Sequence, residues 1–455
     1  MVIVFFDRIE WPSMNIWDPP IERTTLRAAR FVLVVPACVL AAAGAALVSW
    51  EPVIGVGALI AAVVGAAMLR WSHSATLVVL FVLYTNAAVV AVKFHGVPYA
   101  VGAAVPLLLI LPLAHEFFIR KSRIIVTPSL PWIFGMLVLG LFGAIFSARP
   151  ELALMELFVF LVEGLGLYFL LTNLVRTPRM LRAAVWTLLG AGVLMGAVPI
   201  VQQITRSFES DFGGFGQVDG LGFDVEGERA VTTQMRLAGP IGEKNRYAQI
   251  MLMLVPLGLA VAASERRAKL RWLALAATFI AGAGSALAFS RGAAVGFAAA
   301  VLIAACLGVV SKRQLLGIGV GALLILLAIP QYWDRLAAMG DMAGALTGRR
   351  DARSIGDGAV RGRLTEMGAA ALVFFDHPIV GVGPGMFKHH VREYADLIGL
   401  RALAEDREAH NLYLHIAAEY GLPGIACFLI MVGLALRRLA RMRREWLTAN
   451  PVRAR

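Results

Sequence analysis

Charged residues are scarce in this chain. Only 16% of its 455 residues are Asp, Glu, Lys or Arg, whereas 59% are hydrophobic, and the mean hydropathy is +0.75. A soluble protein could not cover so much apolar surface with so few charges. The composition therefore excludes a set of ordinary soluble domains and indicates a membrane protein.

Cysteine is scarcer still. The chain has three, Cys38, Cys306 and Cys427, and all lie inside apolar runs, which excludes a disulfide framework and a cysteine metal site. We also expect the first apolar run to be an anchor rather than a removed signal peptide, because it lacks a convincing small-residue cleavage site. The net charge of +12 is not gathered into a compact basic module, so we expect no nucleic-acid partner.

Long apolar runs are what the sequence has in abundance. A spanning helix needs roughly 20 mostly apolar residues. Runs of that kind predict an all-α, polytopic helix bundle with about twelve spans, at 31–50, 52–70, 74–93, 97–115, 131–147, 152–175, 180–205, 244–263, 269–287, 290–310, 314–330 and 412–436.

The basic residues predict the orientation of these spans. Arginine and lysine crowd alternate short connections and the C-terminal tail, and cytoplasmic loops carry such an excess. We therefore expect both termini in the cytoplasm of a bacterial inner membrane and both long connections outside. The predicted organisation is a cytoplasmic N-terminal tail (1–30), an N-terminal bundle (31–205), a periplasmic loop (206–243), further spans (244–330), a large periplasmic loop (331–411), a last span (412–436) and a basic cytoplasmic tail (437–455).

The larger outer loop has a helical pattern. Leu364, Met367, Ala371 and Phe374 or Phe375 recur at helical spacing, and a glycine-rich turn from Pro378 to Gly385 follows. A second helical stretch is predicted at about 386–398. Loops of this length are usually functional or disordered, and the pattern favours function.

Two arginines stand near the predicted outer interface. Arg291 lies in FSRG between two apolar runs, and Arg236 lies in MRLAGPIGEKNRYAQ before another, with Asn245 at the start of that run. One interpretation is that each only anchors its helix among lipid headgroups. The other is that each grips phosphate, which the planar guanidinium fork suits, next to a helix N-terminus that can bind an anion.

His410 is the candidate base. It lies in EAHNLYLHIAAEYGLPG at the outer mouth of the last span, followed by Asn411 and Tyr413, which could orient a sugar or an acceptor. Histidine can accept a proton near neutral pH, although a structural role is also open. Glu419 follows about two and a half turns later, which makes direct contact with His410 doubtful.

Metal and nucleotide sites are not favoured. His389, His390, His410 and His415 lack zinc-site spacing, and GVGPG lacks the strand and the Lys-Ser/Thr of a phosphate loop. We therefore expect no metal and no cofactor.

In combination, FSRG, the segment RGRLTEMGAAALVFFDHPIVGVGPGMF and HNLYLHIAAEYGLPG resemble the O-antigen ligase and polymerase family in order, spacing and topology. The resemblance covers about 236–430. It implies a transferase that uses an undecaprenyl-diphosphate-linked glycan donor, with lipid A–core or a growing glycan as acceptor. It implies that His410, Arg291 and Arg236 are catalytic, the arginines on the diphosphate, and that Arg361 or Arg363 binds donor or acceptor. The wider substrate-binding set is Arg361, Arg363, Asn411, Tyr413, Asn245 and Glu419.

The expected chemistry is metal-independent and His-assisted, with inversion at the anomeric carbon. Ligase and exopolysaccharide polymerase remain equally open, and a protein O-oligosaccharyltransferase is a further possibility within the family. A secondary transporter is the alternative from another class, since twelve spans are common there, but its polar residues would be expected near mid-membrane.

Overall fold

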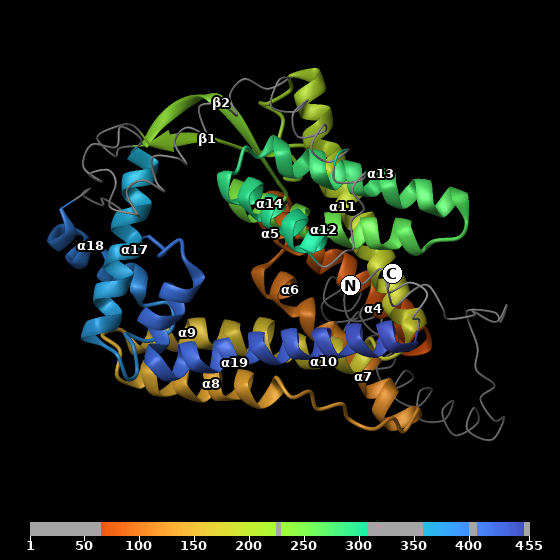
Figure 1. Ribbon diagram of the computed structural model, residues 1–455, viewed down its shortest axis with the longest axis horizontal. Helices are drawn as coiled ribbons and strands as arrows, with labels where there is room; N and C mark the ends of the chain where they lie inside the picture. The colour runs from red at the N-terminus through yellow and green to blue at the C-terminus, as the bar shows by residue number, and fades with distance from the viewer. Residues whose placement is uncertain (1–64, 224–228, 307–315, 317–357, 400–406, 450–455) are drawn as a thin grey trace, which may run out of the picture. The chain divides into compact units, whose positions relative to one another are not determined.

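The structure, a computed structural model, describes residues 65–223, 229–306, 316, 358–399 and 407–449, and these residues are mostly helical (Figure 1). The elements are α4 (Ser72–Tyr84), α5 (Ala87–His95), α6 (Tyr99–Ala104), η1 (Pro106–Leu109), α7 (Ile110–Ala114), η2 (His115–Ile119), α8 (Leu130–Ile145), α9 (Pro150–Val159), η3 (Phe160–Gly166), α10 (Leu167–Leu174), α11 (Pro178–Thr205), β1 (Gln217–Phe223), β2 (Arg229–Gly239), α12 (Lys244–Ser264), α13 (Ala268–Leu287), α14 (Arg291–Cys306), α17 (Gly358–Asp376), α18 (Phe387–Ile398) and α19 (Leu412–Ala449).

Six stretches of the described residues are long and apolar enough to cross a membrane. They are Tyr99–Ile119, Pro150–Leu174, Pro178–Thr205, Lys244–Ser264, Ala268–Leu287 and Leu412–Glu445. Their outer faces carry large exposed apolar side chains, such as Phe158, Trp272 and Phe279. Water would not tolerate so many, whereas lipid chains would. The prediction of a helical polytopic membrane protein is therefore confirmed.

The count of twelve spans is not supported. The predicted span 74–93 is broken into α4 and α5, bent by 58°, because Asn86 between them adopts a left-handed conformation with φ 57°. The predicted spans 131–147 and 290–310 correspond to the shorter apolar helix α8 and to α14. The predicted spans 31–50, most of 52–70, and 314–330 apart from residue 316 lie outside the described residues.

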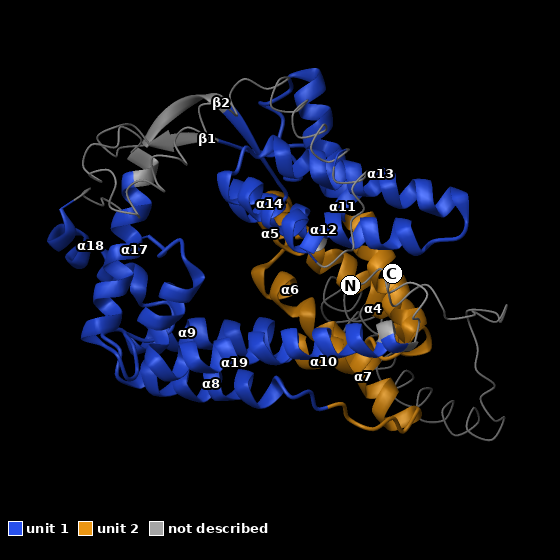
Figure 2. Ribbon diagram, viewed as in Figure 1, with its two compact units in different colours: residues 1–4, 126–166, 192–455 blue, residues 5–125, 167–191 orange. Residues whose placement is uncertain are grey.

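The chain divides into two compact units, coloured separately in Figure 2. Among the described residues, unit 2 holds 65–125 and 167–191, and unit 1 holds 126–166 and everything from 192 onward. The core of unit 2 joins α4, η1, α7 and α10 through buried residues such as Val79, Leu109 and Leu170.

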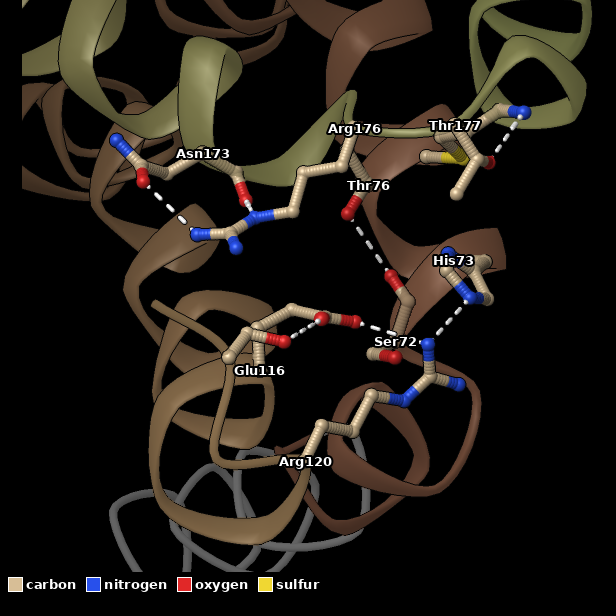
Figure 3. A network of polar contacts seen from close by, with 10 residues as sticks. Ser72, His73, Thr76, Glu116, Arg120, Asn173, Arg176 and Thr177 are labelled. Atoms are coloured by element: carbon tan, nitrogen blue, oxygen red, sulfur yellow. Dashed lines mark hydrogen bonds and ion pairs between the residues drawn. The ribbon is translucent and has the colours of Figure 1, made fainter. Parts of the chain in front are cut away.

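A polar network ties together the helix ends of unit 2 (Figure 3). Arg120 Nη1 donates to His73 Nε2 at 3.0 Å and pairs with Glu116 at 3.1 Å, and Arg176 Nη2 donates to Asn173 Oδ1 at 2.9 Å. Because a guanidinium can only donate, His73 Nε2 must be the acceptor. Arg120 and Arg176 belong to the basic connections that the sequence predicts to face the cytoplasm.

In unit 1, small residues allow α11, α12 and α13 to pack closely. A Cβ on Gly284 would lie 2.7 Å from the Tyr247 hydroxyl oxygen and 3.3 Å from Gly196 Cα. Tyr247 is fully buried and donates to the Met195 carbonyl at 3.0 Å, and Ser285 donates to the Ala248 carbonyl at 3.0 Å. Close approach over small residues is how helices associate in a bilayer.

The outer-loop helices α17 and α18 lie close to the two predicted helical stretches. Their apolar faces form one core with the ends of α8, α9 and α19, in which Ala370, Val373, Phe387 and Val391 are fully buried. The loop helices α17 and α18 are thus packed against the ends of the apolar helices α8, α9 and α19.

The glycine-rich turn after α17 docks into a break in α19. Val382 and Gly383 donate their amides to the carbonyls of Ala418 and Glu419, and Leu422 donates to Pro378. At the break, Gly421 has φ 64° and ψ −165°, a conformation that is essentially limited to glycine. A turn was expected here, but its attachment to the last span was not visible in the sequence.

The first of the two long connections contains a β-hairpin that the all-α prediction did not include. Strands β1 and β2 are antiparallel, and Asp219 pairs in register with Arg236. The strands escaped prediction because QVDGLGF is interrupted by glycines and lacks a clean alternation of apolar and polar residues. The two strands supply hydrogen-bond partners for each other's backbone groups, which the residue types alone do not reveal.

Candidate active site

His410 is presented by a short turn just before α19. Its φ of 47° is left-handed, which is uncommon for a residue other than glycine. The next residue, Asn411, caps the helix: its Oδ1 accepts the amides of Tyr413 at 3.0 Å and Leu414 at 3.2 Å. The cap fixes the start of α19 and thereby positions the preceding residue, His410. The His410 side chain is 46% exposed.

Behind His410 lies Glu366 on α17, which is 1% exposed. One carboxylate oxygen of Glu366, Oε1, accepts a hydrogen bond from Arg407 Nη1 at 3.1 Å, and the other, Oε2, lies 3.7 Å from His410 Nε2. The sequence analysis missed both Glu366 and Arg407. No signal in the pattern pointed to Glu366, because the buried face of α17, which includes Glu366, Ala370 and Val373, is offset from the predicted stripe of Leu364, Met367 and Ala371.

The surroundings of His410 keep its pKa below the usual value of 6.5. Burial of the ring is the largest cause, and the positive charges of Arg363 and Arg407 add to it, whereas the carboxylates of Glu243 and Glu408 act in the opposite direction. A neutral imidazole at neutral pH can accept a proton. The influence of Arg363 and Glu243 also brings the start of α17 and the start of α12 within electrostatic range of His410.

The N-terminus of α12 is capped by the chain itself. Glu243 accepts the amides of Asn245 at 2.9 Å and Arg246 at 2.6 Å. The expectation of free amides at this helix end is therefore wrong for these two groups, because a carboxylate already occupies the place where an anion would bind. Any phosphate bound here must be held mainly by side chains.

The starts of α12 and α14 are joined side by side. Ser290 donates its hydroxyl to Asn245 Oδ1 at 3.0 Å, and the Asn245 side-chain amide donates to Glu243 at 2.9 Å. Arg291 is the first residue of α14 and is half-buried. The predicted residues Asn245 and Arg291 therefore lie at one end of the same helix pair.

Arg236 lies on β2, shortly before the turn that leads into α12. Its side chain is half-buried, and the adjoining residues Leu237 and Ala238 are buried. Opposite it in the hairpin, Asp219 forms an ion pair with Lys244 at 2.6 Å. The hairpin is thus attached to α12, and Arg236 is held near the helix start that Asn245 and Arg291 share.

Glu419 lies away from His410 and serves a different contact. It is buried, accepts the Phe387 amide at 3.3 Å and lies 3.4 Å from His415 Nε2. His415 Nδ1 in turn lies 3.3 Å from Glu408. This second cluster ties α18 and the His410 turn to α19, so Glu419 supports the site from within the bundle.

The remaining predicted residues have more general positions. Arg361 and Arg363 are half-buried one helical turn before Glu366, and the Thr365 hydroxyl donates to the Arg361 carbonyl at 2.9 Å. Tyr413 is 55% exposed, with its ring packed edge-on against Phe428. Within the described residues, no cluster of three His, Cys, Asp or Glu side chains is arranged to hold a metal ion.

The fold and its lipid-facing surface define the class: this is a multi-pass helical membrane protein. One comparison bears on the family: residues 276–429, from within α13 to within α19, match the family model described as O-antigen ligase. This match confirms that this part of the chain resembles the O-antigen ligase and polymerase family. No curated protein and no solved structure matches the chain.

Proposed function

We propose that the chain is a membrane glycosyltransferase. It moves a glycan from an undecaprenyl-diphosphate carrier to an acceptor hydroxyl on the periplasmic face of the bacterial inner membrane. The observation that carries this proposal is the gathering of charged groups from two outer loops around one neutral histidine. Arg363, Glu243 and Arg407 all act on His410, and the matched family segment includes Arg363, Arg407 and His410.

His410 is the proposed base. The acceptor oxygen attacks the anomeric carbon as its proton passes to the imidazole, while the carbon–oxygen bond to the diphosphate breaks and its electron pair leaves with the diphosphate. Attack from the face opposite the leaving group inverts the anomeric centre. A base positioned in this way contributes roughly 10²- to 10⁴-fold to a rate.

Arg236 and Arg291 are the proposed diphosphate ligands. The leaving group already carries negative charge that grows during the reaction, and preorganised guanidinium groups stabilise it without a metal. Asn245 keeps the starts of α12 and α14 together through Ser290. Arg361 and Arg363 then contact the donor or acceptor sugar, and the exposed Tyr413 and the amide nitrogen of Asn411 are further candidates for the acceptor.

The acceptor separates three activities with the same donor chemistry. A ligase transfers the finished glycan to lipid A–core, a polymerase joins repeat units, and a protein O-oligosaccharyltransferase uses Ser or Thr. We favour the ligase and polymerase activities equally, and both over the protein O-oligosaccharyltransferase. The orientation and the twelve-span count, with both termini in the cytoplasm, remain part of the same proposal.

The test is deletion of the gene in its host, with surface glycans separated into lipopolysaccharide and free polysaccharide. Loss of glycan from lipid A–core with long lipid-linked chains accumulating indicates a ligase. Accumulation of single lipid-linked repeat units indicates a polymerase. Unchanged glycans in both fractions would refute a surface-polysaccharide role and turn attention to protein glycosylation or transport.

Complementation tests the proposed base. The His410→Ala variant should restore no transfer although it inserts normally, because no other group would remove the acceptor proton. His390→Ala is the matched control: this histidine lies on α18 of the same outer loop, with its ring against His377. Full activity of His410→Ala would contradict the assignment.

A further inference from the structure

We propose that Glu366 is a positioning residue for His410: its buried carboxylate holds the imidazole by the Nε2 edge and leaves Nδ1 to take the acceptor proton. This inference rests on the proposed function and deepens it. Nothing in the sequence pattern pointed to Glu366. It emerges from the two contacts of one carboxylate, with Arg407 on one oxygen and His410 facing the other.

The carboxylate is held rigidly. Glu366 is 1% exposed on α17, and its neighbours Ala369 and Ala370 on the same helix are fully buried in the core with α18 and α19. Its Oε1 accepts from Arg407 at 3.1 Å, and the Arg407 side chain is itself only 14% exposed. A buried carboxylate with a fixed partner keeps its direction.

The geometry also selects the ring nitrogen. Because Nε2 lies 3.7 Å from Glu366 Oε2, a proton on Nε2 points towards a carboxylate, and the lone pair then resides on Nδ1. The left-handed turn at His410 and the Asn411 cap restrict the ring from the backbone side. Carboxylate and backbone together leave one productive orientation.

The carboxylate matters most when the proton arrives. In the resting protein, Arg407 offsets the charge of Glu366, and burial together with Arg363 keeps His410 neutral. Once Nδ1 has accepted the acceptor proton, the imidazolium is stabilised by the carboxylate at its other edge, until the proton passes to water. The other charged groups around the ring are Glu243, the residue that caps α12, and Glu408 in the same turn as His410.

The first measurement is residue-specific and needs no substrate. The solubilised full chain is treated with diethylpyrocarbonate, which modifies neutral histidine, at a series of pH values across pH 4.5–8. Mass-spectrometric fragmentation of the peptide that contains His410 then gives its modified fraction at each pH, and the midpoint of this curve is compared between variants. Glu366→Gln should lower the midpoint by about one pH unit, because the positive charges of Arg407 and Arg363 are then opposed by one carboxylate fewer. Arg407→Gln should move it the opposite way.

The control is Asp376→Asn. Asp376 lies on the same helix and accepts a hydrogen bond from the Tyr394 hydroxyl at 2.8 Å. Its replacement therefore removes a hydrogen-bonded carboxylate that does not face His410. It should leave the His410 midpoint unchanged. Shifts that are absent in Glu366→Gln, or equal in all three variants, would overturn the inference.

The second measurement is transfer itself. Glu366→Gln should reduce the turnover rate by about 10²-fold, the lower end for a positioned base, with little change in the donor KM and with its acid limb moved to lower pH. If Glu366→Gln does not fold, Glu366→Gln/Arg407→Gln removes both charges together and should show the same loss of turnover. A folded double variant with wild-type turnover would overturn the inference.

The two levels fail separately. If His410→Ala is inactive and Glu366→Gln transfers at the wild-type rate with an unmoved acid limb, the positioning role is refuted and the proposed base stands. If His410→Ala is fully active, the base assignment is refuted and the positioning role with it.

Discussion

At the scale of single residues, charged side chains from the two loops that are predicted to lie outside surround His410. Glu366 and Arg407 form one pair, and Arg363 and Glu243 act on the ring from two other segments. Charge in such a setting must be partnered, because an isolated buried charge is costly. The partners set the protonation state of the histidine, and through it the pH range in which the proposed reaction runs.

The rate of transfer should therefore fall on the acid side only. The active form is the neutral imidazole, whose pKa is lowered, chiefly by burial, from the usual 6.5. The rate should be full above pH 6.5 and fall as the pH drops through the lowered pKa. Initial rates across pH 5–8.5 with a lipid-linked donor measure this.

Arg363→Gln offers a check on the cause. Removal of this positive charge, the second cause of the shift, should move the acid limb towards higher pH. An acid limb with its midpoint above pH 6.5 in the unmodified protein would contradict the neutral-base assignment.

At the scale of elements, the site depends on how the outer loop is fixed to α19. The glycine-rich turn donates its amides to carbonyls at the break in α19, and the cluster of His415, Glu408 and Glu419 holds the preceding turn. A helix interrupted at such a place exposes backbone groups that the turn can pair with. The break is thus a docking point rather than a defect.

Gly421→Ala should be strongly destabilising. Its φ of 64° with ψ of −165° excludes a side chain, and a Cβ would lie 2.5 Å from the Ile379 carbonyl oxygen. Backbone strain and overpacking together should cost about 2 to 4 kcal/mol. Thermal unfolding in detergent, followed by circular dichroism or by exposure of the cysteines, measures the loss.

Gly433→Ala is the matched control in the same helix. No atom lies within 4 Å of a Cβ at this position, so the change should be neutral or stabilise the helix by up to about 1 kcal/mol. Equal melting temperatures for the two variants would show that the break at Gly421 is not required.

At the scale of the whole molecule, the distribution of basic residues carries the orientation. The polar network of Arg120 and Arg176 in unit 2 lies on connections predicted to be cytoplasmic, and the site lies on connections predicted to be outside. A lipid-linked diphosphate donor that has been moved outward would be used on that outer side. The proposed function therefore requires this orientation.

Single-cysteine labelling tests the orientation. In a chain with Cys38, Cys306 and Cys427 replaced by Ser, a cysteine at the exposed position His377 should react with a membrane-impermeant maleimide in intact cells. One at the exposed position Arg438 should react only after the inner membrane is opened. The reverse pattern would invert the topology and remove the periplasmic site.

Much of the fold could be predicted from short stretches of the sequence. Apolar runs long enough to cross a bilayer, basic asymmetry between connections, and the amphipathic pattern of the outer loop are properties of neighbouring residues, so the helical class and α17 and α18 were predictable. His410, Arg291 and Asn245 could be predicted as site candidates because polar residues at the ends of apolar spans cost free energy. The break between α4 and α5 and the β-hairpin were not predictable, because each depends on a backbone conformation or pairing that the residue types do not enforce.

The sequence by itself therefore determined that this is a helical membrane protein, that the connection before the last span contains the helices α17 and α18, and which family its C-terminal half resembles. Only the tertiary structure decided that Glu243 caps its own helix, that Ser290 joins Asn245, that Glu419 supports α18, and that Glu366 stands behind His410. Arg407 and Glu366 are 41 residues apart in the chain. Such partners are brought together by the burial of α17 against α18 and α19, and packing of that kind leaves no periodic signal in the sequence.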